Sequence, residues 1–125
     1  MSNPLYVYIA GPISSDPLGG ARYAVRTAAI VESFGMVPYV PHLGVLWEMI
    51  SPMSYEKWMA LGLAWLAKCD AVLRLPGESK GADREEEEAR RMGIPVFRDI
   101  AELERYSMGL ERFFARKAKG ETGTR

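Results

Sequence analysis

Residues 69–97, CDAVLRLPGESKGADREEEEARRMGIPVF, decide the fold of this chain. The apolar run Asp70–Leu75 predicts a strand, and the Gly- and Pro-containing segment Pro76–Gly81 predicts a loop. Ala82–Met92 then predicts a helix, and Ile94–Phe97 predicts a second strand. Two strands joined by one helix in so short a stretch form a βαβ unit, in which both strands run parallel.

The rest of the chain continues this alternation. Further strands are predicted at Leu5–Ala10 and Met36–Pro41, helices at Ala21–Phe34, at Ser54–Lys68 and from Asp99 onward, and a loop or short helix over residues 43–53. Strands that alternate with helices favour a parallel sheet covered on both sides. We therefore predict an α/β fold: a small doubly wound (Rossmann-like or flavodoxin-like), mostly parallel sheet of four to five strands with helices on both faces.

Length and composition are typical of a small globular protein. The chain has 125 residues, which suits one hydrophobic core, and we predict a single domain over residues 1–117 with a disordered tail over 118–125. Lys plus Arg equals Asp plus Glu at 16 each, so net charge gives no support for a nucleic-acid partner. The lone Cys69 and the lone His42 argue against a structural zinc site, and we expect neither a metal nor a cofactor.

The sequence also gives an expectation about location. No apolar run approaches the ~20 residues of a membrane span, so we expect no membrane partner. The first residues enter an apolar strand directly, without the pattern of a signal peptide. We therefore expect a cytoplasmic protein.

One glutamate in the helix after the loop lies on the apolar side. At about 100° per residue, Glu85 lies in the arc that is formed by Ala82, Ala89, Met92 and Gly93. An acid turned toward a core is costly and is rarely kept without a role. The alternative is an ordinary acid near a helix N-terminus, where it interacts favourably with the helix dipole.

The next glutamates have a simpler interpretation. Glu86 and Glu87 lie four residues before Arg90 and Arg91, so we predict exposed ion pairs on a solvated helix face. The topology selects Glu85 instead. In doubly wound sheets ligands bind beyond the carboxyl ends of the strands, which here selects the loops at residues 11–20 and 76–81. Glu85 is expected in the first helical turn after the second loop.

Two segments carry a family resemblance. Residues 8–14 read Tyr-Ile-Ala-Gly-Pro-Ile-Ser, and Cys69–Leu75 is followed by Ser79-x-Gly-Ala-x-x-Glu-x-x-x-Ala-x-x-x-Gly-Ile-Pro-Val. Together they resemble the nucleoside 2-deoxyribosyltransferase superfamily, and most of all its small bacterial and phage domains of uncharacterised function. The resemblance extends over residues 5–98.

The resemblance implies an enzyme that acts on the N-glycosidic bond of a small nucleotide or nucleoside. Glu85 matches the family nucleophile, which forms a glycosyl-enzyme, and Tyr8 matches the tyrosine that positions it. The positions implied to bind substrate are Gly11, Pro12, Ser14, Ser79, Gly81 and Ala82. The serine at position 79 is implied to favour a nucleoside 5′-monophosphate and hydrolysis, with Lys80 adding positive charge. Relatives of this kind also imply a homodimer or higher homo-oligomer, with a partner chain helping to close the site.

One position departs from the family pattern. The resemblance implies an aspartate eight residues before Asp70, but Gly62 stands there, and Ser14 replaces a basic residue. Three explanations are open: Glu48 or Glu56 substitutes, the leaving base needs little protonation, or the site binds a nucleotide without turnover. Transfer of deoxyribose between two bases is a further alternative. A lone histidine such as His42 is either a general acid or a structural residue.

Overall fold

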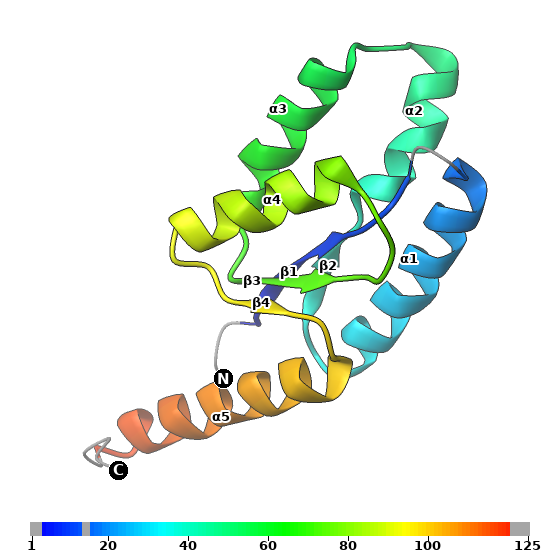
Figure 1. Ribbon diagram of the computed structural model, residues 1–125. Coiled ribbons are helices and arrows are strands. Elements are labelled where there is room, and N and C mark those ends of the chain that lie inside the picture. The colour runs from blue at the N-terminus through cyan, green and yellow to red at the C-terminus, as the bar shows by residue number, and fades with distance from the viewer. Residues whose placement is uncertain (1–3, 14–15, 121–125) are drawn as a thin grey trace.

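The computed structural model describes residues 4–13 and 16–120, which form a parallel sheet with helices on both faces (Figure 1). The strands are β1 (Tyr6–Ala10), β2 (Val37–Tyr39), β3 (Ala71–Arg74) and β4 (Val96–Phe97), in the sheet order β2-β1-β3-β4. All three neighbouring pairs are parallel. The predicted fold class is therefore confirmed, with four strands.

Helices connect these strands. They are α1 (Pro17–Ser33), the 3-10 turn η1 (Pro41–Leu43), α2 (Gly44–Ile50), α3 (Tyr55–Leu66), α4 (Lys80–Arg91) and α5 (Ile100–Ala118). In Figure 1, α3 and α4 lie side by side on one face of the sheet, and α1 covers the other face. None of the described helices is long and apolar enough to cross a bilayer. Helix α5 continues to Ala118, and residues 121–125 of the predicted tail lie outside the described part.

Two helices begin earlier than predicted because a side chain upstream caps them. Asp16 accepts a hydrogen bond from the amide of Gly19, so α1 begins at Pro17. Ser79 accepts one from the amide of Ala82, so α4 begins at Lys80. The second shift moves Glu85 from the first helical turn into the second.

The sheet separates two apolar cores because its side chains alternate between its faces. On the side of α1, Val7 and Ile9 of β1 pack with Leu73 of β3, and Leu103 of α5 joins them. On the side of α3 and α4, the buried residues are Tyr8, Ala10, Leu66, Cys69, Val72, Ala82 and Ala89. Tyr8 is thus a core residue on the face that carries Glu85.

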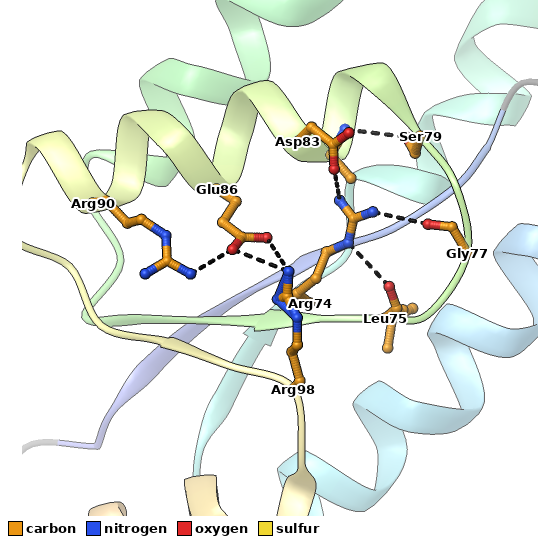
Figure 2. A network of polar contacts seen from close by, with 9 residues as sticks. Arg74, Leu75, Gly77, Ser79, Asp83, Glu86, Arg90 and Arg98 are labelled. Carbon is orange, nitrogen blue, oxygen red and sulfur yellow. Dashed lines mark hydrogen bonds and ion pairs between the residues drawn. The ribbon is translucent and has the colours of Figure 1, made fainter.

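The prediction for Glu86 is wrong. The residue is buried, with a relative exposure of 9%, and its carboxylate accepts hydrogen bonds from Arg90 and from Arg98, which follows β4 (Figure 2). The ion pair with Arg90 was predicted, whereas the second pair, in which Arg98 Nη2 lies 2.9 Å from Glu86 Oε1, was not. Arg91 pairs with Glu88 instead of Glu87.

Candidate active site

The strand order places a topological switch point between β1 and β3. From β1 the chain passes to β2 on one side and later returns to β3 on the other. The loops that leave β1 and β3 therefore diverge there, which is where doubly wound folds bind ligands. The predicted positions Gly11, Pro12, Ser79 and Gly81 lie in or beside these two loops. Ser14 lies outside the described residues.

A hydrogen bond joins the two predicted catalytic residues. The hydroxyl of Tyr8, on β1, donates to Oε2 of Glu85, on α4, at 2.6 Å. Tyr8 is fully buried, and Glu85 is partly buried. The two residues are 77 positions apart in the chain, so only the fold brings them together. This contact uses Oε2 of the carboxylate and leaves Oε1 for other chemistry.

Helix α3 covers this pair through a glycine. A Cβ atom built on Gly62 would lie 2.8 Å from the Tyr8 hydroxyl and 3.3 Å from Glu85 Oε2. The first distance is shorter than real Cβ contacts, so the backbone of α3 approaches the pair more closely than any side chain allows. The position where the resemblance implies an aspartate therefore lies directly against Glu85 and Tyr8, and these two side chains leave no room there for a Cβ atom.

Burial dominates the electrostatics of Glu85. Desolvation raises its pKa to about 7, against the opposing effects of the Tyr8 hydrogen bond and the positive charge of Arg74. Glu85 lies in the second turn of α4, so the helix N-terminus is not among the effects that lower its pKa. Burial and the neighbouring Glu85 carboxylate also raise the pKa of Tyr8, which stays protonated and acts as a donor.

The loop after β3 is held by an arginine that the sequence analysis did not select. Arg74 is buried, donates from Nε to the carbonyl of Leu75 at 3.1 Å, and donates from Nη2 to that of Gly77 at 2.8 Å (Figure 2). Its Nη1 lies 3.1 Å from Oδ1 of Asp83, close enough for an ion pair but without hydrogen-bond geometry. Arg74 therefore ties the loop to the first turn of α4.

The two loops also pack against each other. Gly77 has a φ of +113°, and a Cβ atom there would lie 2.8 Å from Cγ of Pro12. A Cβ atom on Gly11 would lie 2.9 Å from Cβ of Leu75. These glycines permit contact that other residues would prevent, so the predicted loop residues shape the site through the backbone.

The start of α3 lies over the start of α4. A Cβ atom on Gly81 would lie 3.3 Å from the Met59 methyl carbon and 3.6 Å from the Tyr55 hydroxyl. Ala82 is buried, and its amide donates to Ser79. The substrate contact implied for Ala82 stays a prediction, and Tyr55 is a further candidate contact residue that the sequence did not indicate. Tyr55 is the first residue of α3 and follows its N-cap, Ser54. In the sequence it therefore resembles the ordinary start of a helix.

The other candidate acids are engaged elsewhere. Glu48 accepts hydrogen bonds from the amide of Met53 at 3.0 Å and from Nε1 of Trp58 at 2.5 Å, and these lower its pKa. Glu56 is exposed and pairs with Arg84, with Nη1 and Oε1 3.1 Å apart. Both carboxylates are therefore already engaged by donors outside the Tyr8–Glu85 pair.

His42 is fully buried in η1, next to the loop after β1. The backbone of Gly11 and Pro12 is close enough to favour its charged form, but burial has the larger effect and lowers its pKa. Neither ring nitrogen forms a hydrogen bond with good geometry among the described residues. His42 is therefore neutral at physiological pH.

Two surface hollows lie beside the loops. One has a volume of about 220 Å³ and is lined in part by Pro12, Tyr23 and Leu75, and the other, of about 460 Å³, is lined in part by Tyr23, Arg74 and Arg98. Neither hollow is lined by Tyr8 or Glu85. The candidate catalytic centre is therefore the hydrogen-bonded Tyr8–Glu85 pair itself. Among the described residues, no three His, Cys, Asp or Glu side chains gather as a metal site requires.

This fold is that of the 2-deoxyribosyltransferases. The enzyme from the psychrotolerant bacterium Bacillus psychrosaccharolyticus aligns with a TM-score of 0.55 and 17% identity, over 73% of this chain and 69% of that one. The Leishmania mexicana 2-deoxyribosyltransferase aligns with a TM-score of 0.57 and 23% identity, over 74% of this chain and 62% of that one. The fold that the resemblance implied is therefore confirmed.

Within this class, the chain belongs to the family DUF4406, described as a domain of unknown function, whose model matches residues 5–98. The match has the same bounds as the predicted resemblance. No curated protein matches the chain.

Proposed function

We propose that this protein hydrolyses the N-glycosidic bond of a nucleoside 5′-monophosphate, with Glu85 as the nucleophile. The observation that carries the proposal is the buried Tyr8–Glu85 hydrogen bond, 2.6 Å long, beside the switch point of a 2-deoxyribosyltransferase fold. The structural relatives are enzymes that, by name, transfer 2-deoxyribose. A carboxylate close to an anomeric carbon is what retaining glycosyl chemistry requires.

In the proposed first step, Oε1 of Glu85 attacks the anomeric carbon, and the bond from that carbon to the base nitrogen breaks. Tyr8 donates to Oε2, which orients the carboxylate with Oε1 toward the substrate. Water then attacks the glycosyl ester and releases the sugar phosphate and the free carboxylate. Because the pKa of Glu85 is about 7, the nucleophilic form increases as the pH rises through neutrality.

The loop after β3 supports a phosphate group on the substrate. Oγ of Ser79 accepts a hydrogen bond from the amide of Ala82, and the hydroxyl hydrogen of Ser79 is still able to donate one. It caps α4, whose first amides and positive dipole end suit an anion, and Lys80 stands beside it. The Arg74 contacts hold this loop in one arrangement.

Two alternatives have a specific observation each. The names of the structural relatives favour transfer of deoxyribose to a second base. The glycine at position 62 favours binding without turnover, because α3 presents backbone where the resemblance implies an acid. Transfer and binding without turnover would both use the Glu85 site, as hydrolysis would. Only the reaction products distinguish the three functions.

The experiment incubates the protein with a panel of nucleoside and deoxynucleoside monophosphates and measures free base by chromatography. We expect release by the wild type and by Glu87→Ala, a matched control because Glu87 is exposed on the same helix. Glu85→Ala should remove release while leaving the far-UV circular dichroism unchanged. Release by Glu85→Ala at the wild-type rate would refute the assignment.

Added reactants separate the alternatives. A second free base that appears as a new nucleotide would identify transfer. Stabilisation by nucleotides in thermal denaturation without any free base would identify a binding protein.

We also propose that the chain forms a homo-oligomer. Helix α2 exposes Leu46, Met49 and Ile50 at 64%, 72% and 75%, and none of its residues is buried within the chain. Clustered exposed apolar side chains are typical of an interface, and a second copy of the chain is the partner we expect. Sedimentation equilibrium checks this, since a monomer at all concentrations would refute it, and Met49→Glu should weaken the assembly.

A further inference from the structure

We propose that the substrates of this site carry a positively charged base, an N-glycoside whose ring nitrogen is already cationic at the glycosidic bond. The inference depends on the proposed function, because it names the substrate class of the Glu85 site. A neutral base leaves as an anion unless an acid protonates it during bond cleavage. A cationic base leaves as a neutral molecule and needs no proton.

The first argument is the geometry at Gly62. This position contacts both Tyr8 and Glu85, yet a Cβ atom there would lie 2.8 Å from the Tyr8 hydroxyl. The Tyr8 hydroxyl and Glu85 Oε2 therefore leave no room for a side chain at this position of α3. Helix α3 closes over the nucleophile and offers no proton donor from this position.

The second argument is the state of the glutamates near α3. Glu48 accepts hydrogen bonds from a backbone amide and the Trp58 indole, which hold it in the ionised form. A carboxylate that donors keep ionised, as they do Glu48, is a poor general acid. Glu56 is exposed and is engaged by Arg84, with Nη1 and Oε1 3.1 Å apart.

The third argument concerns the remaining titratable side chains that face the site. The Tyr8 hydroxyl already donates its hydrogen bond to Glu85, and burial raises its pKa, so that it is a very weak acid. Tyr39, which packs beside Tyr8 with ring centroids 5.5 Å apart, has a raised pKa for the same reason. His42 is buried in the neutral form. Arg74 faces the site from β3 and is always protonated. None of these four side chains combines a proton with an acidity suited to protonating a leaving base.

A cationic substrate also complements the buried carboxylate. Glu85 is desolvated under α3, and its charge is only partly offset by Tyr8 and Arg74. A cation at the anomeric nitrogen stabilises the ionised carboxylate on binding, so the substrate itself promotes the nucleophilic form. As Oε1 bonds to the anomeric carbon, the electron pair of the breaking bond passes to the ring nitrogen and cancels its charge. Water later supplies the oxygen of the sugar product, and its proton goes to solvent.

The test compares cationic with neutral substrates. One matched pair is 7-methylguanosine 5′-monophosphate and guanosine 5′-monophosphate, which differ by one methyl group and one charge. Nicotinamide mononucleotide adds a pyridinium base, and the common ribo- and deoxyribonucleoside monophosphates complete the neutral set. Each rate is corrected for the rate with Glu85→Ala. General acid catalysis contributes about 10²–10⁴-fold, so we expect the best cationic substrate to exceed every neutral one in kcat/KM by at least about 100-fold.

The outcomes are distinct. Cleavage of a neutral nucleotide within tenfold of the best cationic one would overturn this inference and leave the proposed function intact. Cleavage of none of the compounds would overturn the proposed function, and this inference with it. The pH profile is an independent readout: a rise to a plateau supports the proposal, whereas a bell-shaped profile with the cationic substrate would show that an acid is required and would refute it.

Discussion

Replacing Gly62 with alanine tests how closely α3 approaches the catalytic pair. Inside a helix, Gly→Ala stabilises by about 1 kcal/mol when nothing obstructs the new methyl group. At position 62 the methyl carbon would lie 2.8 Å from the Tyr8 hydroxyl, whereas an ordinary contact begins at 3.4 Å. Either Tyr8 or α3 must therefore move by more than half an ångström, and overpacking of this kind costs about 1–3 kcal/mol. We expect Gly62→Ala to change the free energy of unfolding by between about 0 and −2 kcal/mol.

The matched control is Gly109→Ala. Gly109 lies in α5, and a Cβ atom there meets nothing within 4 Å. This variant should stabilise by about 0.5–1 kcal/mol, or a rise in Tm of a few degrees for a chain of this size. Urea denaturation followed by circular dichroism measures both variants. The difference between them isolates the steric cost, which we expect to be about 1–3 kcal/mol.

The same substitution should alter the chemistry of Glu85. Movement of α3 away from the pair admits water, which lowers the pKa of Glu85 from about 7 toward its usual range. The pH at which base release is half-maximal should fall with it, while Gly109→Ala should leave that pH unchanged. Equal stabilisation by both alanine substitutions, with no change in either pH profile, would refute the close approach of α3.

Three further variants test individual contacts. Tyr8→Phe removes a hydrogen bond that lowers the pKa of Glu85, so the rise in activity with pH should move to higher pH, and an unchanged midpoint would show that the bond is not formed. Glu85→Gln removes a carboxylate whose pKa is about 7 in the folded protein and 4.5 in its ordinary state. The unfolded chain therefore loses this proton at lower pH than the folded protein does. Ionisation of Glu85 costs the fold its full stability penalty above pH 7, and the penalty disappears as the pH falls toward 4.5. The variant should gain up to about 3 kcal/mol in unfolding free energy at pH 8 and little at pH 4.5, and an equal gain at both would contradict the burial of the charge. Arg74→Met should raise KM for a nucleotide more than it lowers kcat, because it frees the loop that carries Ser79. Arg74→Lys should restore less than half of the effect, since an ammonium cannot reproduce the planar contacts to both carbonyls. A loss in kcat alone would exclude the role of Arg74 in holding this loop.

Part of the candidate site could be predicted from the sequence. The helical period indicated that Glu85 faces inward, because this period is a local pattern that is read within about 15 residues. The role of Tyr8 beside it was implied by the family resemblance alone, since no local pattern links two residues that are 77 positions apart. The structure brings the two side chains into hydrogen-bond contact, and their catalytic roles stay predictions.

Long-range contacts explain the errors. Glu86 was expected at the surface because its predicted partner, Arg90, is local, but Arg98 from beyond β4 completes a buried network. Similarly, the raised pKa of Glu85 depends on how closely α3 approaches, which is a property of packing. The glycine at position 62 was recognised from the sequence as a missing acid, and only the structure shows it as a point of contact.

The two cores on opposite faces of the sheet have a consequence for how this protein can change. Neighbouring residues of one strand, such as Tyr8 and Ile9, belong to different cores. Substitutions on the α1 side can adjust stability with a layer of backbone between them and the Tyr8–Glu85 pair. Stabilising substitutions in the core on the α1 side can therefore offset the loss of folding stability that residues such as Glu85 cause under α3. Related chains can then change their chemistry on the α3 face of the sheet while the core on the α1 face maintains the fold.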